Sequence, residues 1–241
     1  DCFYSYRYMA WQMVDENVAH VRPASVYNIL RENKLIHTWA KKEGEAKKKG
    51  FDQPKAPHEQ WHTDISYIKV LDVFYYFISI MDGYSRKILG WELCTNMEGM
   101  NIELLVARVK ERYPEAHARI IHDNGRQFIS KDFKDLIAFL ELYETAARVC
   151  HPQSNGKLER FHGTLKQEHV RRTAYTGYDD AKAKMAQWID FYNTKRLHSA
   201  LNYLTPEDYF SGMKDERLAV RREKLHTADV ARHAYWLTQQ A

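Results

Sequence analysis

Three acidic residues stand where a carboxylate has no evident structural use. Asp64 lies inside a strand-like run at 61–70, and Asp is depleted in strand interiors. Asp123 follows the apolar run 119–122, and a carboxylate at the carboxyl end of such a strand points into the crevice where α/β proteins place their sites. Glu159 falls in the first turns of a helix that we expect to begin near residue 155. These residues are our candidates for chemistry.

Three converging carboxylates favour a hard divalent cation, because Mg²⁺ prefers a few oxygen ligands completed by water and phosphate. Two such ions about 3.5–4 Å apart clamp the attacking and leaving oxygens of an in-line phosphoryl displacement. Without a cation, the clustered charges would raise at least one pKa. If the fold brings the three acids together, we therefore predict two Mg²⁺ ions per site, replaceable by Mn²⁺, and no need for a nucleophilic Ser or Cys.

The helix that carries Glu159 has a distinct core side. At about 100° per residue, Leu158, Phe161 and Leu165 cluster on one side and should pack on a sheet. Glu159 and Lys166 are seven residues apart and stack on another side, which can overhang the ends of strands. An isolated Glu in this position would be a solvated helix residue, so the assignment depends on the other two acids.

The elements that must position these residues begin with three β-rich runs, at 61–70, 73–81 and 88–95. The links at 71–72 and 82–85 are short enough for hairpins, so we predict an antiparallel meander. The middle run is apolar throughout its residues 73–78, as is typical of a strand covered on both faces.

The chain then alternates between helical and strand patterns. We expect a helix at 101–112, a strand at 119–122, a helix at 131–141, a strand at 145–149 and the long helix from about 155. The order β-β-β-α-β-α-β-α predicts an α/β fold with a mixed sheet and helices on both faces.

Helical segments flank this core. Residues 1–40 read as two helices, the first over about 4–16 and the second after Pro23, which suits the first turn of a helix. They are either a helix-turn-helix or a plain helical hairpin. Residues 41–57 combine lysines with Gly and Pro and read as a basic linker, 58–210 as the core, and 211–241 as a tail of one or two helices.

Composition bounds the class of protein. The 241 residues are 44% hydrophobic and 28% charged, which excludes a mostly disordered chain. The longest apolar run is far short of the roughly 20 residues of a membrane span, and no signal peptide is evident. Three scattered cysteines favour a reducing compartment. A net charge of +4 is compatible with nucleic acid. The first residue is not Met, so we expect a fragment that lacks an N-terminal part.

Four motifs then fix a resemblance. They are Trp61-His62-Thr63-Asp64-Ile65-Ser66-Tyr67, Met81-Asp82-Gly83-Tyr84-Ser85-Arg86, His122-Asp123-Asn124-Gly125-Arg126-Gln127-Phe128 and His151-Pro152-Gln153-Ser154-Asn155-Gly156-Lys157-Leu158-Glu159-Arg160-Phe161-His162. In this order, with 35 residues between Asp123 and Glu159, they resemble the integrase core of bacterial insertion-sequence transposases, relatives of retroviral integrases. Residues 192–198 with Thr205-Pro206 resemble the segment that closes this core.

The resemblance implies an RNase H-like fold over about 58–210 and Asp64, Asp123 and Glu159 as the Mg²⁺ ligands of a DDE transposase. It also implies a two-step reaction: cleavage at a transposon end frees a 3′-hydroxyl, which then attacks a target strand. Transposon ends and target are double-stranded DNA, and such enzymes generally act as homo-oligomers on DNA. Residues 1–38 resemble part of a DNA-binding helix-turn-helix. The zinc-binding pattern that precedes the core of retroviral integrases is missing.

Several residues are candidate DNA contacts. Lys166 falls where the family has a basic residue that contacts the DNA end. Asn155 and Gly156 lie in the loop before Glu159, which we expect to be mobile without DNA because Gly permits unusual backbone angles. Four further basic residues are candidate phosphate contacts or solvated helix residues: Arg171, Arg172, Lys195 and Arg196. His62 and His122 flank the acids, and we favour local packing for both.

Two other functions stay open. The same carboxylates would serve a metal nuclease of this fold that cuts without joining. A catalytically idle DNA-binding protein derived from a transposase is a third reading, although it normally lacks one of the acids. We expect a cytoplasmic, nucleoid-associated location in a bacterium and no membrane partner.

Overall fold

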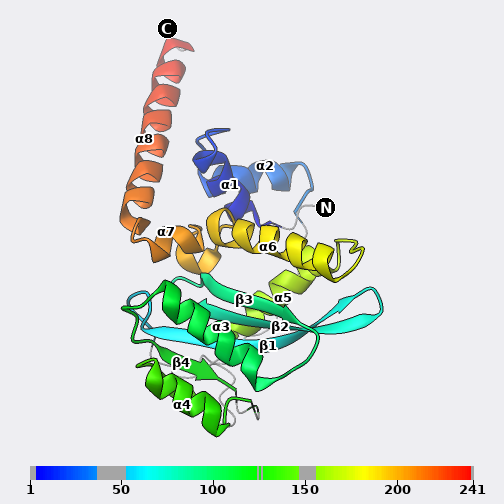
Figure 1. The fold of residues 1–241 in the computed structure, drawn as a ribbon. Helices are drawn as coiled ribbons and strands as arrows, with labels where there is room; N and C mark the ends of the chain where they lie inside the picture. Colours follow the sequence, from blue (N-terminus) through cyan, green and yellow to red (C-terminus); the bar gives the residue numbers. More distant parts are fainter. Residues whose placement is uncertain (1–3, 37–52, 124, 126, 147–155, 240–241) are drawn as a thin grey trace, which may run out of the picture. The chain divides into compact units, whose positions relative to one another are not determined.

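The computed structural model describes residues 4–36, 53–123, 125, 127–146 and 156–239. Within these residues lies a five-stranded sheet in the order β3-β2-β1-β4-β5 (Figure 1). The contacts divide the chain into two compact units, one formed by residues 47–193 and the other by residues 1–46 together with 194–241. The sheet belongs to the first of these units.

The antiparallel half of the sheet is the predicted meander. β1 (Gln60–Val70), β2 (Val73–Asp82) and β3 (Ile88–Cys94) follow one another with antiparallel pairing. The turn after β2 is closed by Asp82, whose carboxylate accepts the backbone N–H of Ser85 at 2.7 Å. A short side chain that bonds the backbone a few residues on is a typical turn device.

The parallel half is formed by two short strands. β4 (Arg119–His122) pairs with β1, and β5 (Tyr143–Ala146) pairs with β4, both in parallel. The mixed sheet is thereby confirmed. β5 begins two residues earlier than the predicted strand 145–149, and residues 147–149 lie outside the described part of the chain.

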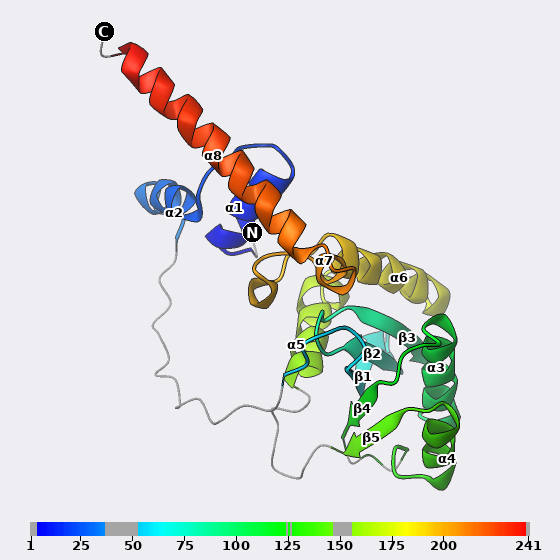
Figure 2. The ribbon, with the colours of Figure 1, turned by 90° about the vertical axis from the view of Figure 1, so that its left-hand side faces the viewer.

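Helices cover both faces of the sheet. α3 (Gly99–Arg112) and α4 (Lys131–Phe139) lie on one face, and α5 (Gly156–Leu165) lies on the other (Figures 1 and 2). α6 (Tyr178–Thr194) joins the α5 side, because its residues Met185, Trp188 and Ile189 share a core cluster with Phe161 and Leu165. Parallel βα units require this arrangement, since each strand of the parallel half must be buried by its crossover.

One expectation about burial was wrong. Val73 and Phe74, at the start of β2, are 54% and 60% exposed, so this strand is not covered along its whole length. The reason is that pairing between β2 and β3 starts only at Tyr76. The first residues of β2 therefore extend past the neighbouring strand in a two-stranded hairpin with β1.

The long helix also differs from its prediction. After Leu165 it widens into a π-helical turn, η1 (Lys166–Val170). A regular α-helix would turn Val170 about 140° away from Leu165, whereas Val170 packs against the same core cluster as Leu165. The wider turn brings His169 and Val170 to the core together, which is a known use of π-bulges.

The other unit is helical. It contains α1 (Tyr6–Asp15), α2 (Pro23–Glu32), the short η2 (Ser199–Leu201), α7 (Pro206–Phe210) and α8 (Lys214–Gln239). The predicted helical pair and the helical tail are both present, and the tail is one helix. Thr205 starts α7 with a capping box, in which its side chain and Asp208 exchange hydrogen bonds. Within the described residues, no helix is both long and apolar enough to cross a bilayer.

Candidate active site

Asp64 lies on β1, and Asp123 directly follows β4, the parallel neighbour of β1. The pairing of β1 with β4 runs from Gln60↔Arg119 to His62↔Ile121. Each aspartate follows the last residue of this β1–β4 pairing by two positions. Side chains alternate with a period of two and strands lie about 4.8 Å apart, so a continuation of the register by two residues would set the two acids at the same level.

The environments of the two carboxylates differ. Asp64 is half-buried, and Asp123 is exposed. Asp123 lies just past the end of β4, where its Oδ1 accepts the backbone N–H of Gly125 at 3.0 Å. An exposed carboxylate that keeps one oxygen in a turn still has free lone pairs for a cation or water.

His162 connects α5 to Asp64. Its Nδ1 lies 3.5 Å from Asp64 Oδ2, and its Nε2 shares a hydrogen bond of 3.0 Å with the hydroxyl of Ser79 on β2. The imidazole is buried. This contact was not anticipated from the sequence, although the side chain stands in the same motif as Glu159. It fixes which flank of α5 faces the first aspartate.

Glu159 lies one turn before His162, on α5, and is exposed. Residues three apart on a helix are neighbours on its surface, so the Glu159 flank is the flank that borders Asp64. Among the residues that the structure describes, His, Cys, Asp and Glu side chains do not gather in threes closely enough to hold a metal ion. Two aspartates and a glutamate on the bordering helix are nevertheless an all-oxygen donor set that suits Mg²⁺ or Mn²⁺.

The two histidines beside the acids are packing residues, as expected. His122 is buried, its Nδ1 contacts the carbonyl oxygen of Asp123 at 2.5 Å, and its ring stacks on Phe128 with 4.7 Å between centroids. His62 is buried as well, and a Cβ added at Gly83 would come within 2.9 Å of its Nε2. Both rings fill space beneath the acidic edge.

The turn between β2 and β3 reaches the same helix. Lys157 Nζ donates a hydrogen bond of 2.6 Å to the carbonyl of Gly83. Burial lowers the pKa of Lys157 to about 8, and the nearby Arg86 contributes to the shift. The sequence marked 81–86 only as a turn motif, so its contact with α5 was missed. The signal that could have revealed it is the arginine at the end of that motif.

The candidate DNA contacts fall in different places. Lys166 is half-buried at the start of η1, while Arg171 and Arg172 are exposed just after it. Gly156 is the first residue of α5, and a Cβ there would meet nothing within 4 Å. Asn155 and the rest of the expected mobile loop lie outside the described residues. Lys195 and Arg196 belong to the helical unit, so the structure does not relate them to the acids.

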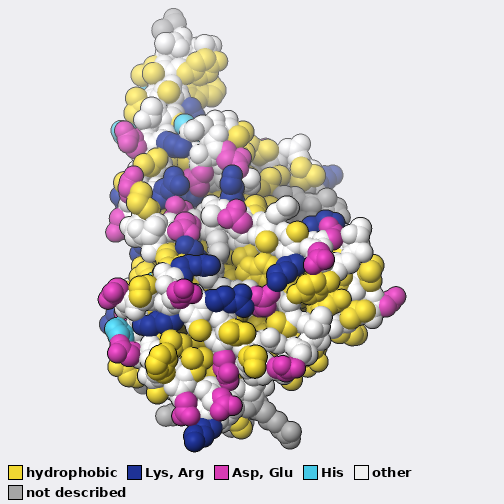
Figure 3. Space-filling model, in the orientation of Figure 1, with side chains coloured by type: hydrophobic (Ala, Val, Ile, Leu, Met, Phe, Trp, Pro, Cys, Tyr) yellow, Lys and Arg dark blue, Asp and Glu magenta, His cyan; other side chains and the backbone are white. Residues whose placement is uncertain are grey.

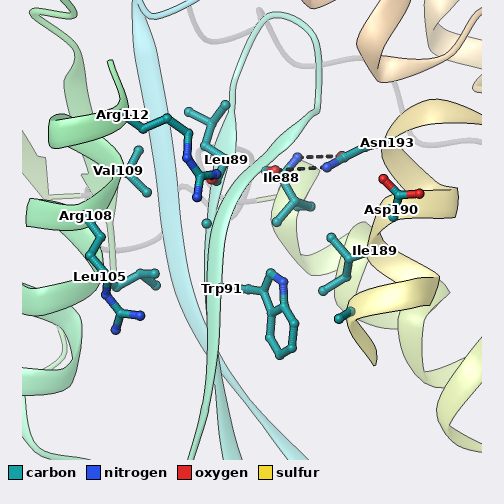
Figure 4. A pocket seen from close by; sticks show the side chains of 12 residues that line it. Ile88, Leu89, Trp91, Leu105, Arg108, Val109, Arg112, Ile189, Asp190 and Asn193 are labelled. Carbon is teal, nitrogen blue, oxygen red and sulfur yellow. Dashed lines mark hydrogen bonds between the residues drawn. The ribbon is translucent and has the colours of Figure 1, made fainter. Parts of the chain in front are cut away.

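A separate pocket of about 290 Å³ lies between α3, β3 and α6 and contains none of the three acids (Figure 4). One side of it is sealed by Asn193, whose amide donates to the carbonyl of Ile88 and accepts the N–H of the same residue. On the face of the molecule in Figure 3, basic and acidic side chains are interspersed. A mixed surface of this kind does not favour a polyanion.

The fold and the acidic edge agree with the comparison with protein families. Models described as "Integrase core domain" match residues 54–154 and 145–206. The chain belongs to the integrase core family. The two matches together span the sheet, the acidic residues and α5, which is the part of the molecule that carries the site.

The curated relatives are proteins of bacterial insertion sequences. The chain is 27% identical over 156 residues to the transposase for insertion sequence element IS904 of Lactococcus lactis, a match covering 64% of this chain and 62% of the relative. It is 26% identical over 160 residues to a putative transposase for IS986/IS6110 of Mycobacterium tuberculosis, with 64% and 58% covered. The matches thus span about three-fifths of the relatives' length.

Solved structures of viral integrases share the fold. The simian T-cell lymphotropic virus intasome in complex with the PP2A regulatory subunit B56 gamma matches with a TM-score of 0.60 and 16% identity, covering 79% of this chain and 67% of that chain. The HTLV-2 integrase catalytic core domain in complex with magnesium matches with a TM-score of 0.53 and 14% identity, covering 65% and 98%. The mixed sheet with flanking helices is therefore the RNase H-like fold that the sequence motifs implied.

Proposed function

We propose that this chain is the catalytic part of an insertion-sequence transposase that cleaves the 3′ ends of its element and joins them to target DNA. The observation that carries the proposal is the parallel pairing of β1 with β4, together with the contact of His162 on α5 with Asp64. It supports an acidic site formed by Asp64, Asp123 and Glu159. Membership of the integrase core family and insertion-sequence relatives support it.

The three carboxylates would hold the divalent cations. Mg²⁺ bound there would activate the attacking hydroxyl and stabilise the charge on the leaving oxygen. Asp64 would bring a half-buried carboxylate to this role, and its Oδ2 lies 3.5 Å from Nδ1 of the buried His162. Asp123 and Glu159 are exposed and can adjust to a substrate that arrives with its own phosphate oxygens.

The reaction consists of two phosphoryl transfers. In the first, water attacks a phosphodiester at the end of the element, the bond to the 3′-oxygen breaks, and a 3′-hydroxyl is released. In the second, that hydroxyl attacks a phosphodiester of the target, a new bond to the 3′-oxygen forms, and the target's own 3′-oxygen leaves. Both steps need an in-line arrangement rather than a protein nucleophile.

The partner is double-stranded DNA of two kinds, the transposon ends and the target. Two ends must be held together for joining, so we expect a homo-oligomer on DNA. The candidate contacts beyond the acids remain Lys166, Asn155, Gly156, Arg171, Arg172, Lys195 and Arg196. The protein would act on the bacterial nucleoid in the cytoplasm.

The test is a joining assay. Purified protein is incubated with Mg²⁺, a supercoiled plasmid and a short duplex that carries the DNA flanking its coding sequence and ends in a free 3′-hydroxyl. Asp123→Asn and Glu159→Gln should abolish joined product, because each removes a negative ligand. The matched controls are Asp135→Asn on α4 and Glu111→Gln on α3, which change the same groups at exposed positions.

The outcomes separate the competing functions. Joined product from either active-site variant would contradict the assignment of the acids. Plasmid nicking by the unchanged protein without joined product would indicate a nuclease of the same fold. DNA binding without either reaction would indicate the idle DNA-binding protein.

A further inference from the structure

α5 has two exposed flanks on either side of its core stripe. Leu158, Phe161 and Leu165 point into the core. Counting about 100° per residue from Lys157, Glu159 lies at about 200° and Arg160 at about 300°. Lys157 and Arg160 therefore share the flank opposite Glu159. One flank borders the acidic edge, and the other borders the turn between β2 and β3.

That turn is held in a fixed conformation. Asp82 is fully buried, and its carboxylate accepts the N–H of His58 at 2.8 Å and the N–H and hydroxyl of Ser85 at 2.7 and 2.6 Å. Arg86 closes the turn with φ of +64° and donates its backbone N–H to the carbonyl of Asp82 at 2.8 Å. A non-glycine residue in this region is uncommon, so the turn holds Arg86 in place despite some backbone strain.

The turn and the helix bring three cations together. Lys157 reaches over the turn to the carbonyl of Gly83. Arg86 is half-buried, and Arg160 is close enough to help lower its pKa, although burial is the larger cause. In the described parts of the chain, no ion pair joins an acid to Arg86, Lys157 or Arg160. The charge of Asp82 acts on Lys157 and partly opposes the lowering of its pKa, but the Asp82 carboxylate already accepts three hydrogen bonds.

Elsewhere the chain pairs such cations. Arg108 and Lys182 both bind Glu92, at 2.9 and 2.5 Å, and Lys184 binds Asp180 at 2.8 Å. Arg86 and Lys157 are half-buried and Arg160 is exposed. Like charges gathered without an ion pair raise the free energy of the folded state, most of all where they are partly buried. A cluster left in this condition is explained if an anion binds to it.

We propose that Arg86, Lys157 and Arg160 form a phosphate-binding site that grips the DNA backbone on the flank of α5 opposite Glu159. The proposal rests on the proposed function, since that function supplies the DNA. The site lies at the first turns of α5, where the helix dipole also favours negative charge. The two flanks of a helix are about 10 Å apart, a distance that a few nucleotides of one strand span at about 3.4 Å each.

The test measures DNA binding without catalysis. Affinity for a 30-base-pair duplex of mixed sequence is determined by fluorescence anisotropy in EDTA over a range of salt. Arg160→Gln and Lys157→Gln should each weaken binding roughly five- to tenfold at 0.1 M salt. Each should also reduce the slope of log affinity against log salt concentration, here called the salt slope, by about 0.9, the effect of one lost phosphate contact. Arg160→Lys should restore both.

The control is Lys134→Gln, an exposed lysine on α4, which covers the other face of the sheet. It removes the same net charge and should leave the slope unchanged. An equal effect of the control, unchanged binding by both variants, or an unfolded Arg160→Gln protein with normal binding by Lys157→Gln would overturn the proposal. Inorganic phosphate at millimolar concentration and matched ionic strength should weaken DNA binding by the unchanged protein more than binding by Arg160→Gln, and an equal effect on both would overturn the proposal.

The two proposals fail separately. If the unchanged protein joins DNA ends while the variants at Lys157 and Arg160 bind DNA normally, the phosphate site is wrong and the transposase function stands. If the variants lose DNA binding as expected but the unchanged protein neither cuts nor joins, the phosphate site stands and the catalytic function is wrong.

Discussion

His162 on α5 lies with Nδ1 at 3.5 Å from the Asp64 carboxylate and with Nε2 at 3.0 Å from the Ser79 hydroxyl. The Asp64 contact is within ion-pair distance, and with the ring proton on Nδ1 the other nitrogen accepts the Ser79 hydroxyl. This buried bridge couples the first acid to the helix that carries the third. It makes His162 a positioning residue, because it acts through Asp64 and not on the substrate.

We predict that His162→Ala lowers Mg²⁺-dependent joining by roughly 10- to 100-fold, the usual effect of losing a partner of a metal ligand. His162→Asn should recover part of the activity, since its amide can still donate to Asp64. The measurement is joining as a function of Mg²⁺ concentration. DNA binding in EDTA should stay unchanged, and a loss of binding that equals the loss of joining would point to a purely structural role.

Asn193 protects the edge of the sheet. Its side chain donates to the Ile88 carbonyl at 3.0 Å and accepts the Ile88 N–H at 2.9 Å, which occupies backbone groups of the edge strand β3 (Figure 4). Asn193→Ala should lower the free energy of unfolding by about 1–3 kcal/mol, because it leaves two backbone groups without partners. Urea unfolding measures the loss.

In Asn193→Ala the uncovered edge of β3 should also make the protein associate more readily, since unpaired strand edges template pairing with other chains. Asn193→Asp is the matched variant: it keeps the acceptor and removes the donor, so an intermediate stability is expected. Equal stability of Asn193→Ala and the unchanged protein in urea would show that water replaces the amide fully.

Glu92 links β3 to two helices and should make stability depend on pH. Burial alone would raise the pKa of Glu92, but hydrogen bonds from Lys182 and Arg108 outweigh it and hold the pKa below the ordinary 4.5. A depressed folded-state pKa means that the stabilisation is present above about 4.5 and is lost as the pH falls through the lower folded value.

Glu92→Gln should therefore destabilise the protein by roughly 1 kcal/mol at pH 7, with allowance for the solvent exposure of its two partners. The difference between variant and unchanged protein should shrink as the pH drops below the ordinary Glu pKa. Urea titrations at several pH values give the comparison, and a difference independent of pH would contradict the ion-pair explanation.

Arg221 fastens α8 to α1 inside the helical unit. It is 2% exposed, binds both carboxylate oxygens of Asp15 at 2.8 and 2.5 Å and donates to the carbonyls of Asn202 and Tyr203 at 3.1 and 2.6 Å. Its guanidinium also lies 4.9 Å from the ring centroid of Trp11. Four of the five guanidinium N–H donors are thus used.

Arg221→Ala should cost about 2–3 kcal/mol, less than the loss from a fully buried ion pair because the Asp15 side chain is 38% exposed and regains water. Arg217→Ala is the comparison, because Arg217 binds Asp208 at 2.9 Å from a 60% exposed position and should cost under about 1 kcal/mol. Thermal unfolding followed by circular dichroism at 222 nm measures both. Similar melting temperatures for the two variants would contradict the ranking.

The order of elements could be read from the sequence because it is encoded locally. Alternation at 61–70, helical spacing at 158–165 and short turns between the first strands depend only on neighbours in the chain. These patterns predicted the mixed sheet and its helices. The same locality explains the two errors: the exposure of Phe74 and the π turn after Leu165 depend on where neighbouring strands end and how the core is filled.

The motifs likewise determined which acids to consider and which family to expect, since residue type and spacing carry that information. Only the tertiary structure decided the relationships among their surroundings: the pairing of the strand of Asp64 with the strand that precedes Asp123, the contact of His162 with Asp64, and the approach of Lys157 to the turn of Arg86. The physical reason is that such contacts join segments about 60 to 100 residues apart. The free energy that selects them comes from packing and register, which the linear order does not specify.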